Sequence, residues 1–449
     1  MVSIIGLQPS NSDRNSMKVY ALEDFDCAPN QLIIGYSTDA NMEAISGTIN
    51  STFNLTLLEK SYKGSFQVVS FNGDKTMEDL IKDIIDDGRV DYVEPNQISQ
   101  ASYVPNDPYF TTYQWNFFSK GRLFTGAASG NVQTASNYGI QVESAWDLFK
   151  PTNTASTAKY PGEGIKVAVI DTGIAYANYI SIGGTISSST AYKKAPDLEG
   201  TIFDSANAKN FTVYPYTNLA IDDHSHGTHV CGTIAQATST VTPLGCAGVV
   251  YKATILPIKV LNKYGSGTNA MVANGIYWAA DKGAKIINLS LGSRYGDNTI
   301  YNAIRYAYNK GIVIVCASGN NGSSVSYPAA YATECIAVGA TNFYGQRCSF
   351  SNFGSSLDIV APGQNVVQQT LTSSSNLSLF SYLSWAGTSM ASPHVAGAAA
   401  LVWSKNPTFT RDQVKTALLN TARDLGATGF DNYYGKGLLD VNAAVRWTP

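Results

Sequence analysis

A long apolar segment, residues 387–403, constrains the fold of this chain more than any other feature. It reads GTSMASPHVAGAAALVW, and its small and apolar residues leave no polar face at helical spacing. A helix of this kind has to be buried, so we expect it to run through a core. Its beginning nevertheless carries the hydroxyl of Ser389, close to the positive end of the helix dipole. Pro393 is expected in the first helical turn, where proline is tolerated, and Gly387 would let another backbone approach closely.

Ser389 by itself is typical of a helix cap, because serine is a preferred residue at that position. A serine acts as a nucleophile only beside a base, and the chain has four histidines that could serve. His394 follows Ser389 by five residues on the same helix, a spacing that turns the two side chains apart. The base is therefore expected among the other three.

Those three histidines lie in residues 222–235, which read DDHSHGTHVCGTIA and predict a loop leading into a helix of small residues. His226 falls at the start of the helix, where its ring reaches outward, and it is the candidate base. His229, one turn further in, is interpreted as a packed core histidine. His224 precedes the helix and is expected to line a cleft without transferring protons.

An orienting acid is predicted at Asp171. It ends the run 167–170, an apolar and mostly β-branched stretch typical of a parallel strand buried on both faces. Functional carboxylates of open α/β sheets gather at the carboxyl ends of strands. Asp171-Thr172-Gly173 also matches the aspartic proteases, but those enzymes need a second such carboxylate, and the sequence has no second Asp-Thr-Gly.

Asp171, then His226 in HGTH, then Ser389 in GTSMASPH resemble the subtilisin-like serine proteases, whose triad follows the chain order Asp, His, Ser. The resemblance extends from about Asn106 to Leu439, and residues 105–110, PNDPYF, are most similar to the thermitase-like branch. It implies that Ser389 attacks the scissile carbonyl, that His226 takes and returns the proton, and that Asp171 fixes the imidazole tautomer.

The resemblance also implies an oxyanion site and a substrate cleft. Asn320 follows a buried-strand run and would donate its side-chain amide to the oxyanion, although a turn asparagine would also suit its Gly-Asn-Asn-Gly setting. Backbone that pairs with the peptide is expected at Ser290, Leu291 and Gly292 and at Gly265, Ser266 and Gly267. Ser326 falls at the floor of the first specificity pocket. Since it is small and uncharged, we expect broad cleavage after apolar, aromatic or medium polar residues.

The chain before Tyr103 predicts a separate small domain. Strands are expected at 31–36, twice within 55–71 and at 90–93, with helices at 39–49 and 76–87. This β-α-β-β-α-β order is a ferredoxin-like split unit. By resemblance it is an inhibitory propeptide and folding assistant, although an unrelated α+β domain would give the same pattern.

We therefore divide the chain into an N-terminal extension (1–30), a propeptide domain (31–97), a linker (98–105) and a catalytic domain (106–449). The linker is mostly polar, and self-cleavage is expected in it next to Ser102 or Tyr103. The catalytic domain is predicted to be α/β, a parallel sheet with helices on both faces, because strands and helices alternate from Gly164 onward.

Composition excludes several other classes of protein. Charged residues make up only 14% of the chain and the net charge is −3, which leaves no basic footprint for nucleic acid. No apolar run approaches the roughly 20 residues of a membrane span. Six cysteines in 449 residues are too few for a disulfide framework, and Cys231 is interpreted as a small buried hydrophobe rather than a nucleophile.

No cofactor is expected for the chemistry, but the resemblance suggests a structural calcium ion. The matching carboxylates are Asp107 and Asp197, which could equally be surface residues, and Asp222 is similarly ambiguous. The loop 236–245 departs from the family pattern. Two extra surface loops are expected at 119–136 and at 181–190.

The sequence is therefore interpreted as the zymogen of a monomeric, exported endopeptidase that acts on peptides and proteins and is inhibited by its own propeptide. The chain begins without a basic n-region or a long apolar h-region, so export rests on the resemblance alone. Two alternatives stay open, a catalytically silent binding protein with the same fold and a processing protease of narrow specificity.

Overall fold

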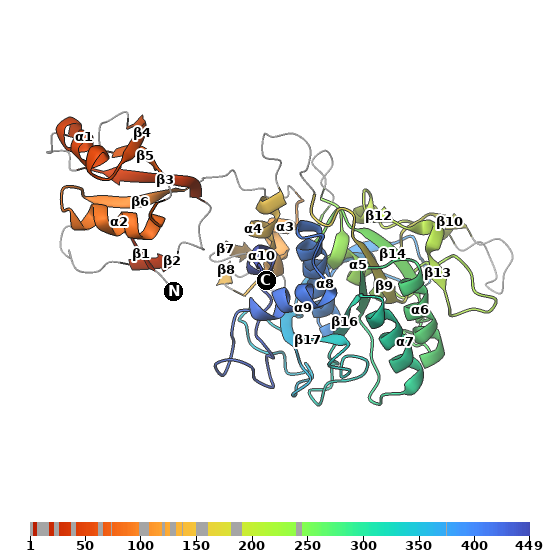
Figure 1. Ribbon diagram of the computed structural model, residues 1–449. Coiled ribbons are helices and arrows are strands. Elements are labelled where there is room, and N and C mark those ends of the chain that lie inside the picture. Colours follow the sequence, from red (N-terminus) through yellow and green to blue (C-terminus); the bar gives the residue numbers. More distant parts are fainter. Residues whose placement is uncertain are drawn as a thin grey trace. The chain divides into compact units, whose positions relative to one another are not determined.

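The computed structural model describes residues 3–6, 18–21, 27–36, 42–61, 66–72, 74–97, 107–118, 122–125, 132–136, 138–149, 160–180, 191–238, 245–373 and 375–449. It divides into two compact units, Met1–Ala101 and Ser102–Pro449 (Figure 1). The division falls inside the predicted linker, whose residues 98–105 lie outside the described part of the chain.

The first unit is a four-stranded antiparallel sheet with two helices, as the sequence predicts. Its strands pair in the order β4-β5-β3-β6, which is the ferredoxin-like arrangement. The elements are β3 (Cys27–Gly35), α1 (Met42–Thr52), β4 (Leu55–Lys60), β5 (Phe66–Phe71), α2 (Met77–Asp86) and β6 (Tyr92–Gln97). A short antiparallel pair precedes them, β1 (Ser3–Gly6) with β2 (Lys18–Ala21).

The helix α2 shows why this unit folds as the sequence indicates. Thr76 caps it by accepting a hydrogen bond from the backbone N–H of Asp79. Leu80, Ile81 and Ile84 lie on one face at helical spacing, and all three are buried against the sheet.

The second unit is built on a parallel sheet in which, within the described residues, the main path of strands is β12-β14-β9-β15-β16-β17-β18, with β13 paired beside β14. The strands are β9 (Lys166–Asp171), β12 (Ile202–Phe203), β13 (Lys209–Asn210), β14 (Thr254–Lys259), β15 (Ile286–Leu289), β16 (Val313–Ala317), β17 (Cys335–Thr341) and β18 (Ile359–Pro362). In its centre β9 pairs with β14 on one side and β15 on the other, so both of its edges are covered.

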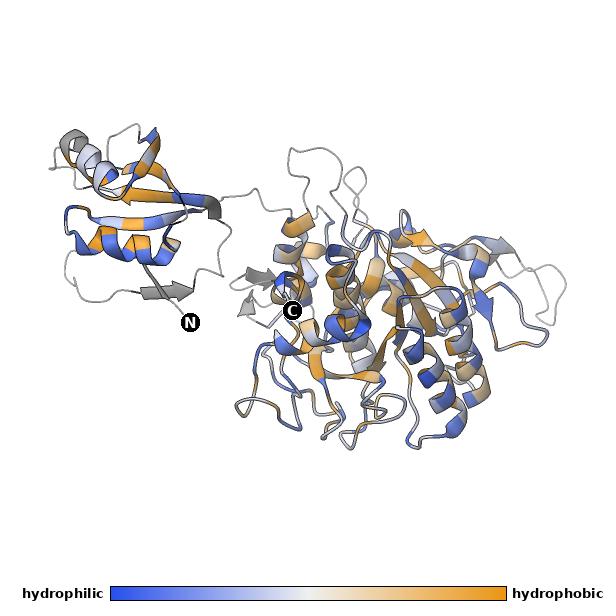
Figure 2. Ribbon diagram, viewed as in Figure 1, coloured by the Kyte–Doolittle hydropathy of each residue, from blue (hydrophilic) through white to orange (hydrophobic). Residues whose placement is uncertain are grey.

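Helices cover both faces of this sheet, as predicted. Their bounds are α3 (Phe110–Tyr113), α4 (Val142–Trp146), α5 (His226–Ala235), α6 (Asn269–Asp281), α7 (Asn298–Asn309), α8 (Thr388–Lys405), α9 (Arg411–Asn420) and α10 (Val441–Arg446). Val167 and Val169 of β9 belong to the core beneath α5 and α8, whereas Ala168 and Ile170 belong to the core beneath α6 and α7. This alternation is why the strand is apolar at each of positions 167–170. The strands of this sheet and α8 appear as the hydrophobic centre of the second unit in Figure 2.

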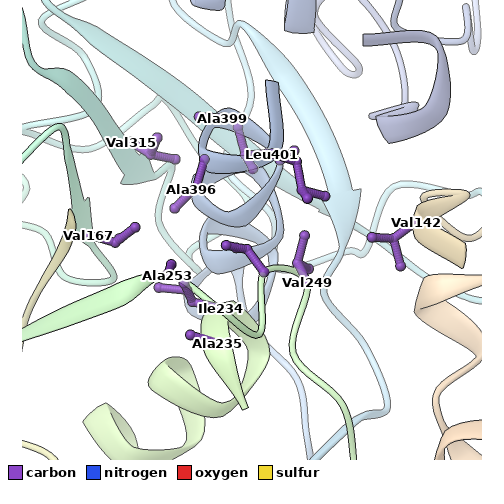
Figure 3. Close-up of a cluster of buried hydrophobic side chains, with 14 of the residues drawn as sticks. Val142, Val167, Ile234, Ala235, Val249, Ala253, Val315, Ala396, Ala399 and Leu401 are labelled. Atoms are coloured by element: carbon purple, nitrogen blue, oxygen red, sulfur yellow. The ribbon is translucent and has the colours of Figure 1, made fainter. Parts of the chain in front are cut away.

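The apolar helix α8 runs through the larger core. From Met390 to Ser404 each of its residues is buried. Ala396, Ala399 and Leu401 lie among side chains from the sheet and from the segment after α5, including Val315 and Val249 (Figure 3).

The prediction for Pro393 is wrong in one respect. The helix begins at Thr388, so Pro393 is its sixth residue and lies inside the helix rather than in its first turn. A proline there leaves the carbonyl four residues earlier, that of Ser389, without an intrahelical donor.

The two extra surface loops that the sequence predicts have different outcomes. Residues 119–136 are not simply a loop, since β7 (Arg122–Thr125) and β8 (Val132–Ser136) form an antiparallel pair within them. The predicted loop at 181–190 lies outside the described residues, between the paired strands β10 (Tyr179–Ile180) and β11 (Ala191–Tyr192). A longer antiparallel hairpin, β19 (Val366–Leu371) with β20 (Phe380–Trp385), leads into α8.

Among the residues that the structure describes, no helix combines the length and the apolar character needed to cross a membrane.

Candidate active site

The structure brings Asp171 and His226 together from two different elements. Asp171 is the last residue of β9, His226 is the first residue of α5, and the two are 55 positions apart in the chain. Oδ1 of Asp171 lies 2.7 Å from Nδ1 of His226, and the carboxylate is fully buried. Gly227 permits this approach, because a Cβ there would lie 2.1 Å from the carbonyl oxygen of Gly173.

A second buried carboxylate, Asp222, holds the loop that carries His226. Its Oδ1 accepts hydrogen bonds from the backbone N–H groups of His224 and Ser225 and from the hydroxyl of Thr172. Its Oδ2 accepts from the N–H and the hydroxyl of Thr228, at 3.0 and 2.6 Å. Because both oxygens are engaged by protein donors, Asp222 is a structural anchor in this protein rather than a metal ligand.

This anchoring holds the residue before His226 in an unusual conformation. Ser225 has a φ of 102°, in the left-handed region that residues with a side chain rarely adopt. Its N–H is held by Asp222, and its carbonyl accepts a hydrogen bond from the hydroxyl of Thr370 in β19. Strained residues held from several sides are typical of functional sites.

The pKa of His226 is raised above its usual 6.5. Burial lowers this pKa, but the negative charge of Asp171, the hydrogen bond to it and the charge of Asp222 together raise it further. The Asp171 bond engages Nδ1, so the neutral ring carries its proton there and leaves Nε2 with a free lone pair.

The other histidines lie where the sequence predicts. His229 is fully buried, its ring lies parallel to Trp385 at 4.6 Å between centroids, and burial lowers its pKa to about 3. His394 is buried against Asn116, with its Nδ1 2.8 Å from the carbonyl of Met390, and burial lowers its pKa to about 4. His224 lines a cavity beside His226.

Ser389 is the second residue of α8, and the strand that leads into this helix approaches His226. The indole of Trp385, four residues before Ser389, lies 6.3 Å from the His226 ring at an interplanar angle of 24°. Within the described part of the chain, the Ser389 hydroxyl donates one hydrogen bond, to the carbonyl of Ser290 at 3.2 Å. That distance is long for an O–H donor, so the hydroxyl is only weakly held.

Asn320 lies beside Ser389 with a fixed orientation. Its Oδ1 accepts hydrogen bonds from the N–H and the hydroxyl of Thr388, at 2.8 and 2.9 Å. The Nδ2 group therefore points away from Thr388, and no acceptor for it lies among the described residues. A Cβ on Gly387 would lie 3.5 Å from this Nδ2 and 3.6 Å from the backbone nitrogen of Ser389, so the two donors border the same small space.

A third group of contacts fixes Ser389 through its backbone. The carbonyl that Pro393 leaves without a donor accepts a hydrogen bond from Oγ of Ser290 at 2.9 Å. That hydroxyl accepts in turn from Nδ2 of Asn288, whose Oδ1 accepts from Ser392. Sequence reasoning identified the backbone of Ser290 but missed its side chain and Thr388, because both depend on long-range contacts. It also missed the anchoring role of Asp222, although four of its five hydrogen bonds lie within six residues.

Two cavities border the candidate site residues, and both are lined by Leu291, Gly292 and Ser293. One, of about 560 Å³, is lined by His224, His226, the segments 264–267 and 290–293, and several tyrosines. Gly265, Ser266 and Gly267 border it in an exposed turn, and Ser290, Leu291 and Gly292 border it from the end of β15. The other, of about 540 Å³, is lined by Ser389, Asn320, Ser326 and the segment 291–294. Ser326 therefore shares a cavity with the candidate nucleophile.

Asp107 and Asp197, the predicted metal ligands, are not surface residues. Their exposed fractions are 2% and 3%. Burial raises the pKa of Asp197 to about 7, while the N–H of Cys246 and the hydroxyl of Tyr382 lower it and the charge of Asp107 raises it. The two carboxylates therefore influence one another inside the protein.

The cysteines after the linker are all buried and unpaired. Burial raises the pKa of Cys231, so this residue near His226 stays a thiol, which agrees with its interpretation as a small buried hydrophobe.

Comparison with family models gives two matches. Residues 162–437 match the model described as the subtilase family. Residues 15–96 match the model described as the fervidolysin N-terminal prodomain.

Curated relatives and solved structures agree with these matches. The chain is 35% identical over 374 residues to a thermophilic serine proteinase of Bacillus sp. strain AK1, a match that spans 83% of this chain and 77% of that protein. It is 42% identical over 286 residues to subtilisin Savinase of Lederbergia lenta, spanning 64% and 92%. A protease structure from Pseudoalteromonas arctica superposes with a TM-score of 0.59 and 29% identity, over 76% of this chain and 99% of that one. Sphericase gives a TM-score of 0.54 and 30% identity, over 67% and 97%.

Proposed function

Since the chain belongs to the subtilase family of serine proteases and carries an N-terminal prodomain, we propose that it is the zymogen of an endopeptidase with Asp171, His226 and Ser389 as its catalytic triad. The observation that carries this assignment is the 2.7 Å contact between the fully buried Asp171 carboxylate and Nδ1 of His226. A buried carboxylate in that position holds the imidazole in the tautomer whose Nε2 accepts a proton.

In the proposed reaction the Ser389 hydroxyl leaves the Ser290 carbonyl, turns toward Nε2 of His226 and attacks the scissile carbonyl carbon. The Oγ–C bond forms as the carbonyl π electrons move to oxygen and the hydroxyl proton passes to Nε2. Collapse of the tetrahedral intermediate returns that proton to the leaving amine and leaves an acyl-enzyme, which water hydrolyses by the same route. The weak 3.2 Å hydrogen bond in the unbound enzyme supports this reorientation.

The oxyanion is expected to be stabilised by Nδ2 of Asn320 and the backbone N–H of Ser389. Both donors border the space beside Gly387, and Thr388 keeps the oxygen of the Asn320 amide turned away from it. Donors that are already oriented stabilise developing charge without reorganising during the reaction.

The peptide is expected to lie along Ser290, Leu291 and Gly292 on one side and Gly265, Ser266 and Gly267 on the other, with the residue before the scissile bond directed toward Ser326. The cavities that the two segments border support this placement. Main-chain pairing of this kind gives affinity with little dependence on sequence, which favours broad specificity over narrow processing.

Self-processing is tested by following the intact mass of the purified chain over time beside Ser389→Ala and the control Ser375→Ala, which changes an exposed serine outside both cavities. The parent and the control should split near residue 103, and Ser389→Ala should stay whole. If neither parent nor control splits, and both ignore a denatured protein and a serine-directed fluorophosphonate, the catalytically silent binding protein becomes the better assignment.

We also propose a structural calcium ion held in part by Asp107 and Asp197. Buried carboxylate and amide oxygens are ligands that suit this hard cation. Oε1 of Gln236 and Oε1 of Gln368 are buried without a hydrogen-bond partner among the described residues, and both would lie 2.9 Å from a Cβ on Gly232. Residues 239–244 of the adjoining loop lie outside the described part of the chain.

Calcium is tested by the melting temperature with and without a chelator. The parent and Asp412→Asn, a control at an exposed aspartate, should lose stability when calcium is removed, and Asp107→Asn should respond less. An equal response of all three variants would argue against this site. We also expect an extracytoplasmic location, which the prodomain match supports and which fractionation tests. A monomeric state is expected as well, and sedimentation of the processed enzyme tests it.

A further inference from the structure

The cavity lined by Ser326 carries a single positive charge among its described lining residues, which are otherwise uncharged. Among the described residues that line it, Arg294 is the one charged side chain, and none is acidic. The remaining lining is made by uncharged residues, most of them small or polar. A peptide side chain that enters this cavity from Ser389 therefore meets a single positive charge.

Arg294 has no carboxylate to neutralise it within the described residues. It is exposed, its guanidinium carbon lies 5.6 Å from the centroid of the Tyr295 ring, and it forms no ion pair there. Asp297, the acidic residue next along the chain, caps α7 by accepting from the N–H of Ile300 and borders the other cavity. The positive charge of Arg294 is thus available to a ligand.

At the floor of the cavity, Ser326 offers a hydrogen-bond donor. Its Oγ accepts from Nδ2 of Asn352 at 3.1 Å. The orientation of Asn352 is fixed, because its Oδ1 accepts from the N–H groups of Asn321 and Ser323 at 2.9 and 3.1 Å. The Ser326 oxygen is therefore an acceptor toward Asn352, and its own hydrogen has no protein acceptor among the described residues.

We propose that Arg294 and Ser326 together make this cavity select for a carboxylate or carboxamide side chain before the scissile bond, and against a basic one. The inference rests on the proposed function. Within a broad specificity, it names a charge preference: glutamate over lysine, with glutamine between them.

The charge effect is expected to be modest, because Arg294 is exposed. An exposed ion pair changes an equilibrium by about two- to fivefold, and salt screens it. A peptide with glutamate should lose that factor when the charge of Arg294 is removed, and a peptide with lysine should gain it. The ratio of the two should therefore fall by about four- to 25-fold.

The test uses four fluorogenic peptides that differ only in the residue before the scissile bond, which is glutamate, glutamine, lysine or methionine. Their kcat/KM values are measured on the self-processed parent, on Arg294→Gln and on Arg305→Gln, at low and high salt. Arg305 is an exposed arginine of α7 that lines neither cavity, so it matches the change in net charge. The glutamate-to-lysine ratio should fall in Arg294→Gln alone, and the loss should shrink at high salt.

Ser326→Ala tests the donor separately. It should lower kcat/KM for the glutamate and glutamine peptides by about two- to tenfold relative to methionine, the usual effect of one hydrogen bond. If the ratio in Arg294→Gln stays within twofold of the parent and of Arg305→Gln, the charge preference is overturned. If no peptide is hydrolysed, the proposed function fails instead, and binding of the same peptides to the parent and to Arg294→Gln then decides the charge preference.

Discussion

The beginnings of α5 and α8 carry the two residues between which a proton must move, and they are anchored by different chemistry. The start of α5 is held by the carboxylates of Asp171 and Asp222, with exposed fractions of 0% and 1%. The start of α8 is held by neutral groups, the amide of Asn320 and the hydroxyl of Ser290. The histidine side therefore depends on buried charge, and the serine side depends on several hydrogen bonds that can be lost one at a time.

The largest effect is expected on the histidine side. Asp171→Asn should lower kcat by about 10⁴-fold, because an amide in this position favours the wrong imidazole tautomer. The measurement is kcat on a peptide substrate, with circular dichroism to show that the fold is kept. A loss below tenfold would contradict the role given to the carboxylate.

On the serine side, Asn320→Ala should have a smaller effect on kcat. Loss of one oxyanion donor costs about 10²- to 10³-fold in kcat and leaves KM nearly unchanged, because the donor acts mainly in the transition state. Asn321→Ala is the matched control, since its side chain neighbours the same cavity and Thr388 does not hold it. A rise in KM with kcat preserved would assign Asn320 to substrate binding instead.

The second carboxylate of the histidine side should matter most for stability. In Asp222→Asn one oxygen becomes an amide donor that faces other donors, such as the N–H of Thr228. A buried donor left without a partner costs about 1–3 kcal/mol in the free energy of unfolding. Urea unfolding of Asp222→Asn beside the exposed control Asp412→Asn measures this cost. Equal midpoints would show that the loop does not depend on the carboxylate.

The positions of the main site residues can be predicted from the sequence, because they depend on local sequence patterns. Asp171 ends an apolar strand, and His226 and Ser389 each begin a helix of small residues, so their positions follow from patterns a few residues long. The same holds for the burial of His229, which its place one turn into a buried helix predicts.

The parts that could not be predicted depend on distant contacts. Nothing near Ser290 indicates that its hydroxyl meets a carbonyl 99 residues away, and nothing near Thr388 indicates that it orients Asn320. Pro393 was expected in the first turn because a proline inside a helix removes a hydrogen bond. The structure tolerates Pro393 inside the helix because the hydroxyl of Ser290 supplies the missing donor to the Ser389 carbonyl.

Acidification should lower kcat/KM by about tenfold for each pH unit below the pKa of His226, through an effect on the histidine side alone. Catalysis needs the neutral ring, so activity falls as the pH drops through this pKa, which lies above the usual 6.5. The stability linkage has the opposite sign. The charged pair with Asp171 stabilises the fold fully below pH 6.5, and this contribution is lost as the pH rises through the raised pKa. NMR titration of His226 in Ser389→Ala gives the pKa directly, and a value below 6.5 would contradict the balance of effects.

The smallest effect is expected at the hydrogen bond from Ser290 to the carbonyl of Ser389, which replaces the bond that Pro393 cannot make. Ser290→Ala removes the hydroxyl that donates to the Ser389 carbonyl and leaves the backbone of Ser290 in place for the substrate. One neutral hydrogen bond corresponds to about two- to tenfold in kcat, with KM little changed. Ser290→Thr keeps the hydroxyl and should restore part of the loss, which a merely structural role would not require. A loss comparable to that of Asn320→Ala would show instead that the serine side depends on this one contact as strongly as on the oxyanion donor.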